Sequence, residues 1–298
     1  MPRKRRPVHT DRVYHVFNRG NYKQPIFRDQ RAMEAFLRAL YETLKIYRWE
    51  VYAYAIMPNH YHLCLRTPDG DLSDGMHRLL TAFNTRFNRF RKESGHPFQG
   101  RFKSVVSPLG MSVRRFIDYI HLNPVRAQLL KLSSLAKSRV TSLSAYLNPG
   151  MRGPLAISEA FQKYVGFEDT PAGHAAYMQA LMVLAQEDVY GEKFEEDWRV
   201  FGKIEKHMPR NAPAAIVPGL ATSRQTVQIK RRNRWEAELI ARAAALDMDL
   251  SELIILPRRD PRKLELARHL YRDIGAPASW IAPRLHLGRP SNLHTLLA

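Results

Sequence analysis

Two histidines, His60 and His62, stand one residue apart in the stretch HYHLCLRT, whose composition favours a strand. In a strand, side chains two positions apart point to the same face with Cα atoms about 7 Å apart, so both imidazoles can converge on one ion. A single histidine here would indicate a core residue. The pair predicts a metal site, and two core histidines are the alternative that the spacing leaves open.

A second group lies in RRFIDYIHLNPVRA, residues 114–127, which has a helical pattern. Tyr119 and Asn123 are four residues apart, so they share one face of a helix, one turn from each other. Asn123 can supply an oxygen ligand, and Tyr119 can place a phenolic oxygen beside the ion. The simpler interpretation is a half-buried aromatic residue and a helix stop. His121 points to roughly the opposite side and is a poorer third ligand.

These residue types together suit the covalent cleavage of a phosphodiester. A metal ion polarises the scissile phosphate and balances the charge that builds on its oxygens, while the tyrosine oxygen attacks in line. One end of the strand then stays on the protein as a phosphotyrosine, and the leaving group is a 3′-hydroxyl.

The charge of the chain fits a nucleic-acid substrate. The 298 residues include 47 Lys and Arg against 28 Asp and Glu, a formal net charge of +19. Residues 1–135 carry 24 basic and 10 acidic side chains, residues 136–220 carry 9 and 10, and residues 221–298 carry 14 and 8. A large positive field favours polyanions, of which nucleic acid is the commonest, whereas ordinary solvated lysines and arginines are the alternative.

Composition and cysteine usage exclude several classes of protein. With 45% hydrophobic residues, 15 Gly and 19 Pro, the chain is neither collagen-like nor a low-complexity disordered protein. Its single cysteine, Cys64, lies in an apolar run and cannot form an internal disulfide. The basic start MPRKRRPVHT has no apolar segment behind it, and no stretch reaches a membrane-spanning length. We therefore expect a cytoplasmic protein with no membrane partner.

The elements that must position the candidate residues alternate as in an α+β domain. We expect strands over residues 12–20, 49–57, 60–67 and 102–108, and helices over about 30–47, 74–93 and 112–122. Asp29 and Ser73 are the expected N-caps of the first two helices, and Asn123-Pro124 is expected to end the third. This order predicts a ferredoxin-like antiparallel sheet with helices on one face.

The chain divides into three expected parts. Residues 1–135 form the catalytic domain. Residues 136–220 have helical patterns over 155–165, 172–189 and 194–206 and then a proline-rich stretch, HMPRNAPAAIVPGL, which predicts a helical spacer and linker. Residues 221–298 predict an all-helical C-terminal extension.

Three short amphipathic segments close that extension, over residues 261–273, 277–287 and 289–298. Their spacing is that of a helix-turn-helix, with the last helix as the candidate reader of a DNA groove. A plain helical bundle is the alternative.

Four blocks of the sequence resemble the successive signatures of the REP-associated tyrosine transposases, a branch of the single-tyrosine HUH transposases of bacterial insertion sequences. The blocks are VYHVFNRGN (13–21), AYAIMPNHYHLCLRTP (53–68), FQGRFKS (98–104) and YIHLNPVRA (119–127), in that order. The resemblance covers about residues 8–130. It implies a ferredoxin-like HUH fold for the first domain.

The resemblance also implies roles for the matching positions. His60 and His62 would be the metal ligands, Tyr119 the nucleophile, and Asn123 the helix residue that supplies a further ligand. Members of the family cut single-stranded DNA at hairpin-forming palindromic repeats and use Mg²⁺ or Mn²⁺. Related insertion-sequence enzymes act as dimers that place the tyrosine helix of one subunit over the metal of the other, so a homodimer is expected, although some members of this branch work as monomers.

Basic residues near these positions are candidates for DNA contacts. Arg101 and Lys103 alternate on one strand face, and Arg114 and Arg115 begin the tyrosine helix. Arg19 and Asn21 lie in the first family block, where turn residues are the alternative. The N-terminal residues Arg3, Lys4, Arg5 and Arg6 predict a basic arm for non-specific or minor-groove contact.

The sequence thus favours a metal-dependent endonuclease and strand-transferase of single-stranded DNA with a tyrosine nucleophile. A non-catalytic DNA-binding regulator that uses the C-terminal helix-turn-helix is the main competitor. A hydrolytic metalloenzyme is the third hypothesis, but such enzymes need further His and Asp ligands that the chain does not arrange.

Overall fold

The computed structural model describes residues 10–107, 113–187 and 224–297 of the chain. The described residues form two compact units, the first made of residues 10–44 and 49–187, the second of residues 45–48 and 224–297. Each unit has its own buried core.

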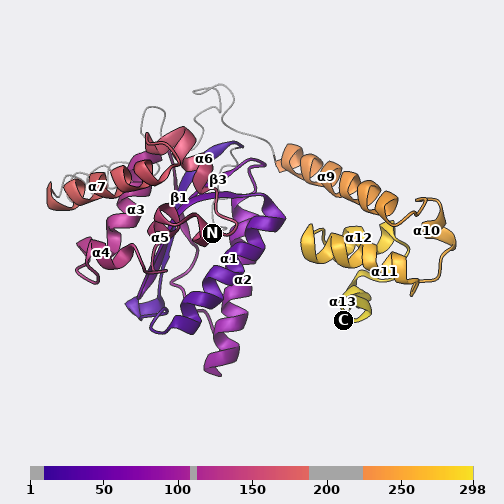
Figure 1. The fold of residues 1–298 in the computed structure, drawn as a ribbon. Helices are drawn as coiled ribbons and strands as arrows, with labels where there is room; N and C mark the ends of the chain where they lie inside the picture. Colours follow the sequence, from indigo (N-terminus) through magenta and orange to yellow (C-terminus); the bar gives the residue numbers. More distant parts are fainter. Residues whose placement is uncertain (1–9, 108–112, 188–223, 298) are drawn as a thin grey trace, which may run out of the picture. The chain divides into compact units, whose positions relative to one another are not determined.

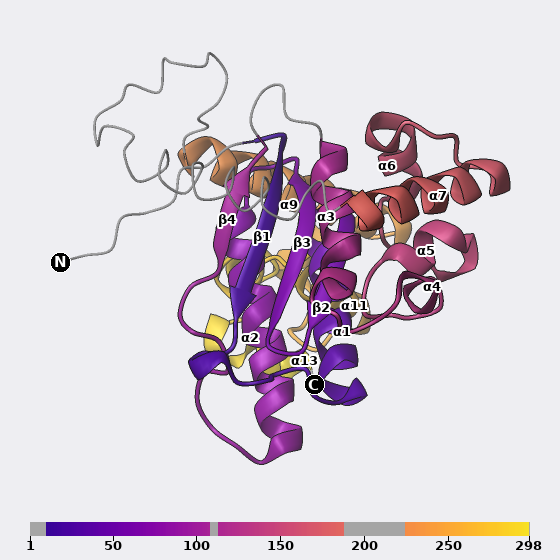
Figure 2. The ribbon, with the colours of Figure 1, turned by 90° about the vertical axis from the view of Figure 1, so that its left-hand side faces the viewer.

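A four-stranded antiparallel sheet organises the first unit, as Figure 2 shows. Its strands are β1 (Arg12–Arg19), β2 (Glu50–Met57), β3 (His60–Thr67) and β4 (Lys103–Val106). They lie in the order β2-β3-β1-β4, and every neighbouring pair is antiparallel. This is the predicted ferredoxin-like arrangement, in which the two central strands carry the signature residues.

The alternation of side chains along β3 assigns its residues to two faces of the sheet. Tyr61, Leu63 and Leu65 point to one face, and His60, His62 and Cys64 point to the other. All of them except the half-buried His60 are buried, because helices cover both faces of the sheet.

Helices α1 (Gln30–Tyr47) and α2 (Leu72–Arg91) cover the face to which Tyr61 points, on one side of the sheet in Figure 1. Phe36 of α1 packs against Tyr61 with ring centroids 4.6 Å apart, and Phe83 of α2 packs against Phe36. The predicted cap of α1 is confirmed, because Asp29 accepts a hydrogen bond from the backbone N–H of Ala32 at 2.8 Å.

The predicted cap of the second helix is wrong, since α2 begins at Leu72, before Ser73. The N-cap is Asp71, whose backbone carbonyl accepts from the N–H groups of Asp74 and Gly75. Its carboxylate instead accepts from the Trp49 indole at 2.9 Å. The Trp49 ring lies against Gly75 so closely that a Cβ there would overlap it. Packing of this indole on the first turn therefore sets the start of the helix.

Helix α3 (Val113–Arg126) covers the opposite face of the sheet, where it packs on β2 and β3. The expectation of helices on one face alone is therefore wrong. It runs past the expected end at residue 122, with Pro124 inside it, so the predicted stop is wrong. The ring removes one backbone donor, but the last turn still closes through the Ala127 N–H to the Asn123 carbonyl at 3.0 Å. Pro124 and Leu122 are buried, and their packing offsets the lost hydrogen bond.

The segment after α3 folds around this helix and along the edge of β2. It contains α4 (Leu132–Leu135), α5 (Leu143–Leu147), η2 (Pro149–Met151), α6 (Ile157–Ala160), η3 (Phe161–Val165) and α7 (Pro171–Glu187). Thr141 bridges Ala55 of β2, and the Tyr146 hydroxyl donates to the Tyr52 carbonyl at 2.9 Å. The described part of the predicted spacer therefore contributes to the core of the first unit. The expected helix over 194–206 and the linker lie outside the described residues.

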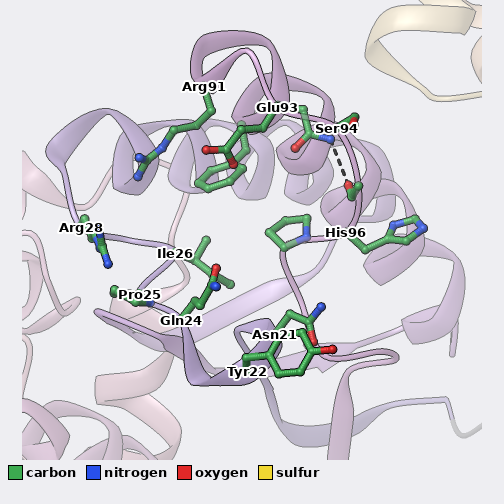
Figure 3. Close-up of a pocket in the computed structure, with 14 residues that line it drawn as sticks. Asn21, Tyr22, Gln24, Pro25, Ile26, Arg28, Arg91, Glu93, Ser94 and His96 are labelled. Carbon is green, nitrogen blue, oxygen red and sulfur yellow. Dashed lines mark hydrogen bonds between the residues drawn. The ribbon is translucent and has the colours of Figure 1, made fainter.

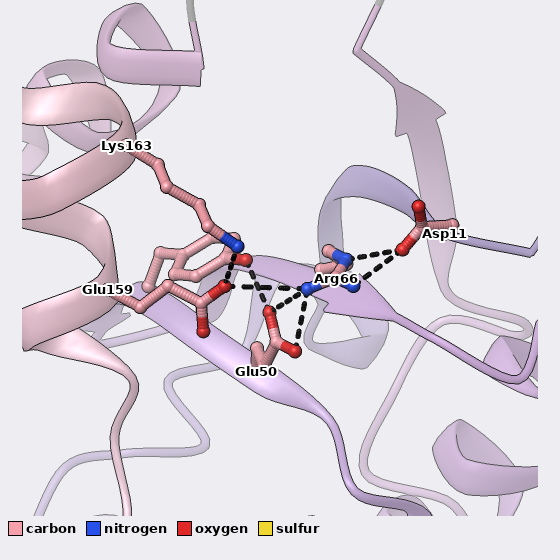
Figure 4. Close-up of polar contacts among 6 residues, drawn as sticks. Asp11, Glu50, Arg66, Glu159 and Lys163 are labelled. Carbon is pink, nitrogen blue, oxygen red and sulfur yellow. Dashed lines mark hydrogen bonds and ion pairs between the residues drawn. The ribbon is translucent and has the colours of Figure 1, made fainter.

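An ion-pair network ties α6 to the edge of the sheet (Figure 4). Arg66 of β3 contacts Glu50 of β2 at 2.5 Å, Asp11 at 2.6 Å and Glu159 of α6 at 3.5 Å. Lys163 pairs with the same Glu159. The Arg66 and Glu50 side chains are only 21% and 23% exposed, so water screens this network less than an ordinary surface pair.

The second unit is helical, as predicted. It contains α9 (Arg224–Ala245), α10 (Glu252–Ile255), α11 (Pro261–Arg268), η5 (His269–Asp273), α12 (Ala278–Arg284), η6 (Pro290–Asn292) and α13 (Leu293–Leu297). Its core includes Leu239, Leu266, Leu270, Ile281 and Leu293. The three short amphipathic segments expected at the C-terminal end correspond to α11 with η5, to α12, and to η6 with α13.

Across the ranges that the structure describes, no helix has both the length and the apolar character needed to cross a membrane.

Candidate active site

The two predicted ligand histidines lie side by side on one face of β3. The imidazole rings of His60 and His62 have centroids 4.9 Å apart and are nearly perpendicular, at 84°. His62 is buried beneath α3, and His60 is half-buried at the end of the strand. The alternation of β3 therefore brings both rings to the same place, as the spacing predicted.

A third histidine, which the sequence analysis did not single out, supports this pair. His15 of β1 lies within hydrogen-bond distance of His62, with its Nε2 2.8 Å from the His62 Nδ1. Phe17 is the direct cross-strand neighbour of His62, so His15, two residues earlier, shares that face of the sheet. The alternating stretch VYHVF indicates a strand that carries His15. The sequence does not give the register of this strand against β3, which is what places His15 beside His62.

Neighbouring side chains orient the two candidate ligand histidines through their Nδ1 atoms. The Nδ1 of His60 lies 2.6 Å from the side-chain oxygen of Asn59, to which it donates, and the Nδ1 of His62 is occupied by His15. The Nε2 of each ring is then the atom that can bind a metal. A hydrogen bond to the other ring nitrogen is the usual way in which proteins orient such a ligand.

The protonation of the histidines suits the same role. Burial and, to a smaller extent, the charge of Arg19 lower the pKa of His60 to about 4, against the opposing effect of a hydrogen bond with Asn123. Burial lowers the pKa of His15 to about 3 and holds the pKa of His62 well below its ordinary value. All three rings are thus neutral at pH 7, the form in which imidazole binds a metal.

Tyr119 of α3 lies beside these rings in the same chain. Its ring centroid is 5.8 Å from that of His62 and 5.9 Å from that of His15. The guanidinium of Arg126 lies over the tyrosine ring, 5.6 Å from its centroid. Asn123, one turn after Tyr119, reaches His60. The structure therefore brings His60, His62, Tyr119 and Asn123 together.

The opposite side of α3 is anchored by a buried hydrogen-bond chain. Asp118 accepts from the Tyr177 hydroxyl at 2.9 Å, the His121 Nδ1 lies 2.9 Å from the same hydroxyl, and the His121 Nε2 lies 2.8 Å from the Ser142 hydroxyl. This places His121 away from the site, as expected. The chain links α3 to α7 and α5, so it fixes the helix that carries Tyr119.

The side chains of the candidate site could provide some, but not all, of the ligands of a hard divalent cation. Among the described residues, no group of three or more His, Cys, Asp or Glu side chains can hold a metal ion. Two neutral imidazoles and the Asn123 amide would instead leave positions for water and phosphate oxygens, which is the coordination that Mg²⁺ and Mn²⁺ favour.

Comparison with known proteins finds a family similarity in the part of the chain that carries the site. Residues 9–123 match the sequence family described as "Transposase IS200 like", a range that contains both histidines and Tyr119 and ends at Asn123. This part of the chain is therefore similar to the IS200-like transposases.

Other comparisons are more distant. A solved structure, described as a REP-associated tyrosine transposase bound to a REP hairpin, is similar to this chain at 17% identity with a TM-score of 0.41. The similarity covers 51% of this chain and 87% of that one. No curated protein matches the chain.

The basic side chains of the first unit differ in how close they lie to the site. Arg19 is opposite His60 across the β1–β3 pair, and Lys103 is opposite Phe17, with its ammonium 5.9 Å from that ring. Both are exposed on the face that carries the histidines. Arg101 is exposed too, but it precedes β4 instead of alternating with Lys103 along it.

Arg114 and Arg115, at the start of α3, point in different directions. Arg115 is exposed one turn before Tyr119, on the same helical stripe. Arg114 instead pairs with Asp118 at 3.3 Å, and its guanidinium lies over the Phe167 ring at 5.0 Å, so it serves the anchor of the helix. Arg3, Lys4, Arg5 and Arg6 lie outside the described residues.

Asn21 faces a cavity next to the site instead of the site itself (Figure 3). It belongs to η1 (Asn21–Lys23), which directly follows β1, and its backbone N–H donates to the Pro97 carbonyl at 2.8 Å. The cavity holds about 540 Å³ and is also lined by Tyr22, Arg28 and His96. Tyr22 is 85% exposed, with a φ of 50°, so its ring is presented at the rim.

Proposed function

We propose that the chain is a metal-dependent endonuclease and strand-transferase of single-stranded DNA in which Tyr119 is the nucleophile. The observation that carries the proposal is the position of the Tyr119 ring beside His62, with Asn123 one turn further along and in contact with His60. A tyrosine next to two neutral imidazoles and an amide has the parts that covalent phosphodiester cleavage requires.

In this reaction the Tyr119 oxygen attacks the scissile phosphorus and loses its proton to solvent. The bond from phosphorus to the 3′-oxygen breaks, and that oxygen leaves as a 3′-hydroxyl after taking up a proton. The 5′-phosphate stays on Tyr119 as a phosphodiester of the phenol, so a 3′-hydroxyl can later reverse the step and join a strand. When bound by His60, His62 and Asn123, Mg²⁺ or Mn²⁺ would supply charge stabilisation at the phosphate.

The surrounding side chains support a single-stranded substrate. Arg19 and Lys103 flank the histidines and can hold phosphates on either side of the scissile one, and Arg115 continues this positive edge along α3. From Arg19 the chain leads to the cavity beside Asn21, where the exposed ring of Tyr22 gives an unpaired base a surface on which to stack. The choice of hairpin-forming repeats rests on the resemblance of the four sequence blocks.

Covalent capture tests the proposal directly. A labelled hairpin oligonucleotide with single-stranded flanks is incubated with the full chain and Mg²⁺ or Mn²⁺, and the adduct is measured on a denaturing gel. We expect an adduct that needs the metal and disappears in Tyr119→Phe, and Tyr22→Phe serves as the matched control that keeps it. An adduct of full yield in Tyr119→Phe would refute the assignment, as would cleavage with no adduct.

A further inference from the structure

We propose that the second unit binds duplex DNA through a surface formed by the loop before α11 and the segment that ends the chain. This C-terminal face comprises Arg258, Arg259, Arg289, Ser291, Asn292 and His294, all of them exposed. The inference goes beyond the proposed function, because the face belongs to the second unit and its binding needs neither Tyr119 nor a metal.

Charge is the first observation that favours a polyanion here. Residues 274–298 contain Arg284 and Arg289 but no Asp or Glu. Several acidic residues of this unit are also neutralised internally: Glu236 pairs with Arg284 at 2.9 Å, Glu252 pairs with Arg262 at 3.6 Å, and Glu265 pairs with Arg242. Within the described ranges, Arg258, Arg259 and Arg289 have no carboxylate partner, so their charge is available to phosphates.

The Arg258 guanidinium lies against the turn that carries Arg289. Gly288 has a φ of 92°, and a Cβ added to it would lie 3.2 Å from the Arg258 Nη1. The Arg258 guanidinium therefore lies against the turn that leads from α12 into η6, and Arg289 is the next residue along that turn. A φ of this sign favours glycine, so Gly288 fixes the turn on which Arg289 stands next to the Arg258 guanidinium's contact point.

The segment after this turn presents short polar side chains on a fixed frame. Leu293 and Leu297 are buried in the core of the unit, which leaves Ser291, Asn292 and His294 on the outer side. The Arg272 guanidinium donates to the Leu297 carbonyl at 3.0 Å and holds the far end of α13. Hydroxyl, amide and imidazole groups are those that bind base edges in a groove, and a helix packed on two others is the usual way to present them.

The aromatic residues of this unit argue for a duplex instead of a single strand. Proteins that bind single strands stack bases on exposed rings. Within residues 224–297, the aromatic residues Trp235, Tyr271 and Trp280 all pack against the core of the unit. The ring centroids of the two tryptophans lie 5.5 Å apart. The C-terminal face thus offers phosphate contacts and base-edge contacts but no stacking surface.

A blunt duplex without single-stranded ends tests the proposal on the full chain. The Tyr119→Phe variant is used, so that no covalent trapping contributes, and binding is measured by fluorescence anisotropy over a series of salt concentrations. We expect the double change Arg258→Ala and Arg289→Ala to weaken duplex binding about tenfold or more and to lower the salt slope by about 2. Arg242→Ala with Arg284→Ala is the matched control, since these arginines are already paired, and we expect less than a threefold change.

A second variant, Asn292→Ala with His294→Ala, changes only exposed positions and so leaves the core of the unit intact. We expect it to select a broader set of duplexes from a random pool than the parent chain selects. The proposal is overturned if the parent chain does not bind the duplex, or if the Arg258 and Arg289 variant binds as well as the parent does. With Tyr119 intact, that arginine variant should still form the hairpin adduct, so a missing adduct would count against the proposed function alone.

Discussion

The Tyr119 ring stands nearly perpendicular to the His62 ring, at 86°, with 5.8 Å between the centroids, and both belong to one chain. No second copy is needed to bring the phenol to the histidine pair. This differs from the arrangement expected by resemblance to dimeric insertion-sequence enzymes, in which the tyrosine helix of one subunit serves the metal of the other. We infer that this chain cleaves with its own tyrosine.

A mixing experiment distinguishes the two arrangements. Tyr119→Phe and His62→Ala each remove one half of the site, so a mixture contains no chain that has both halves. We expect the mixture to form no more adduct than either variant alone, measured with the labelled hairpin oligonucleotide. Recovery toward a quarter or more of the parent yield would show that subunits exchange their tyrosine helices. Light scattering with and without the hairpin gives the accompanying oligomeric state.

The hydrogen bond between His15 and His62 makes His15 a candidate positioning residue for the proposed metal site. The change His15→Phe keeps a ring in the core but removes the partner of the His62 Nδ1. Loss of such a partner typically weakens metal binding about 10- to 100-fold. We therefore expect the Mn²⁺ concentration for half-maximal adduct to rise by this factor, with near-normal yield at saturating metal.

Recovery of adduct formation by His15→Phe at high Mn²⁺ concentration distinguishes a positioning role of His15 from general damage to the fold. A variant that is merely unfolded would stay inactive at every Mn²⁺ concentration. An unchanged metal requirement in His15→Phe would show that the contact has no bearing on the ion. His77→Phe is a suitable control, because His77 lies on α2 and that helix covers the opposite face of the sheet.

The sequence predicts those parts of the candidate site in which residues close together in the chain share one face of a strand or helix. His60 and His62 share a face because a strand alternates, and Tyr119 and Asn123 share a face because a helix repeats, so spacing alone was sufficient. His15 required the register of β1 against β3, which depends on the fold as a whole. The hydrogen-bond chain that anchors α3 joins residues far apart in the chain: Asp118, His121, Ser142 and Tyr177. No local sequence pattern predicts it.

The two errors in the helix limits have the same origin. Ser73 is a good capping residue and Asn123-Pro124 is a good stop, if only local preferences act. In the folded chain the Trp49 indole occupies the first turn of α2, and the burial of Leu122 and Pro124 carries α3 through the proline. Tertiary packing therefore overrode local preference at both places.

Asp118 should make the stability of the first unit depend on pH. Burial raises its pKa to about 6 from 3.8, against the opposing effects of Arg114 and Tyr177. Between these two pH values Asp118 is protonated more often in the folded chain than in the unfolded one. The contribution of Asp118 to stability is therefore greatest below about pH 4 and is lost as the pH rises through about 6. The full effect is about 3 kcal/mol.

The change Asp118→Asn removes this titration but keeps an oxygen that can accept from the Tyr177 hydroxyl. We expect urea unfolding of the variant, followed by near-ultraviolet circular dichroism, to lose the part of the pH dependence that lies between pH 4 and 6. Other carboxylates still titrate in both proteins, so the difference between the two curves is the measured quantity. Parallel curves for the variant and the parent would show that Asp118 keeps an ordinary pKa.

The last prediction concerns Arg66, which joins three carboxylates from different parts of the first unit (Figure 4). Arg66→Met keeps the apolar stem of the side chain but leaves Glu50 without its cation and Glu159 with Lys163 alone. Because the Arg66, Glu50 and Glu159 side chains are only 21%, 23% and 26% exposed, we expect a loss of about 1–2 kcal/mol in the free energy of unfolding. Arg86→Met is the matched control: its pair with Glu42 is more exposed, so we expect a loss below about 1 kcal/mol. Equal losses in urea unfolding of the two variants would mean that the network adds nothing beyond an isolated surface pair.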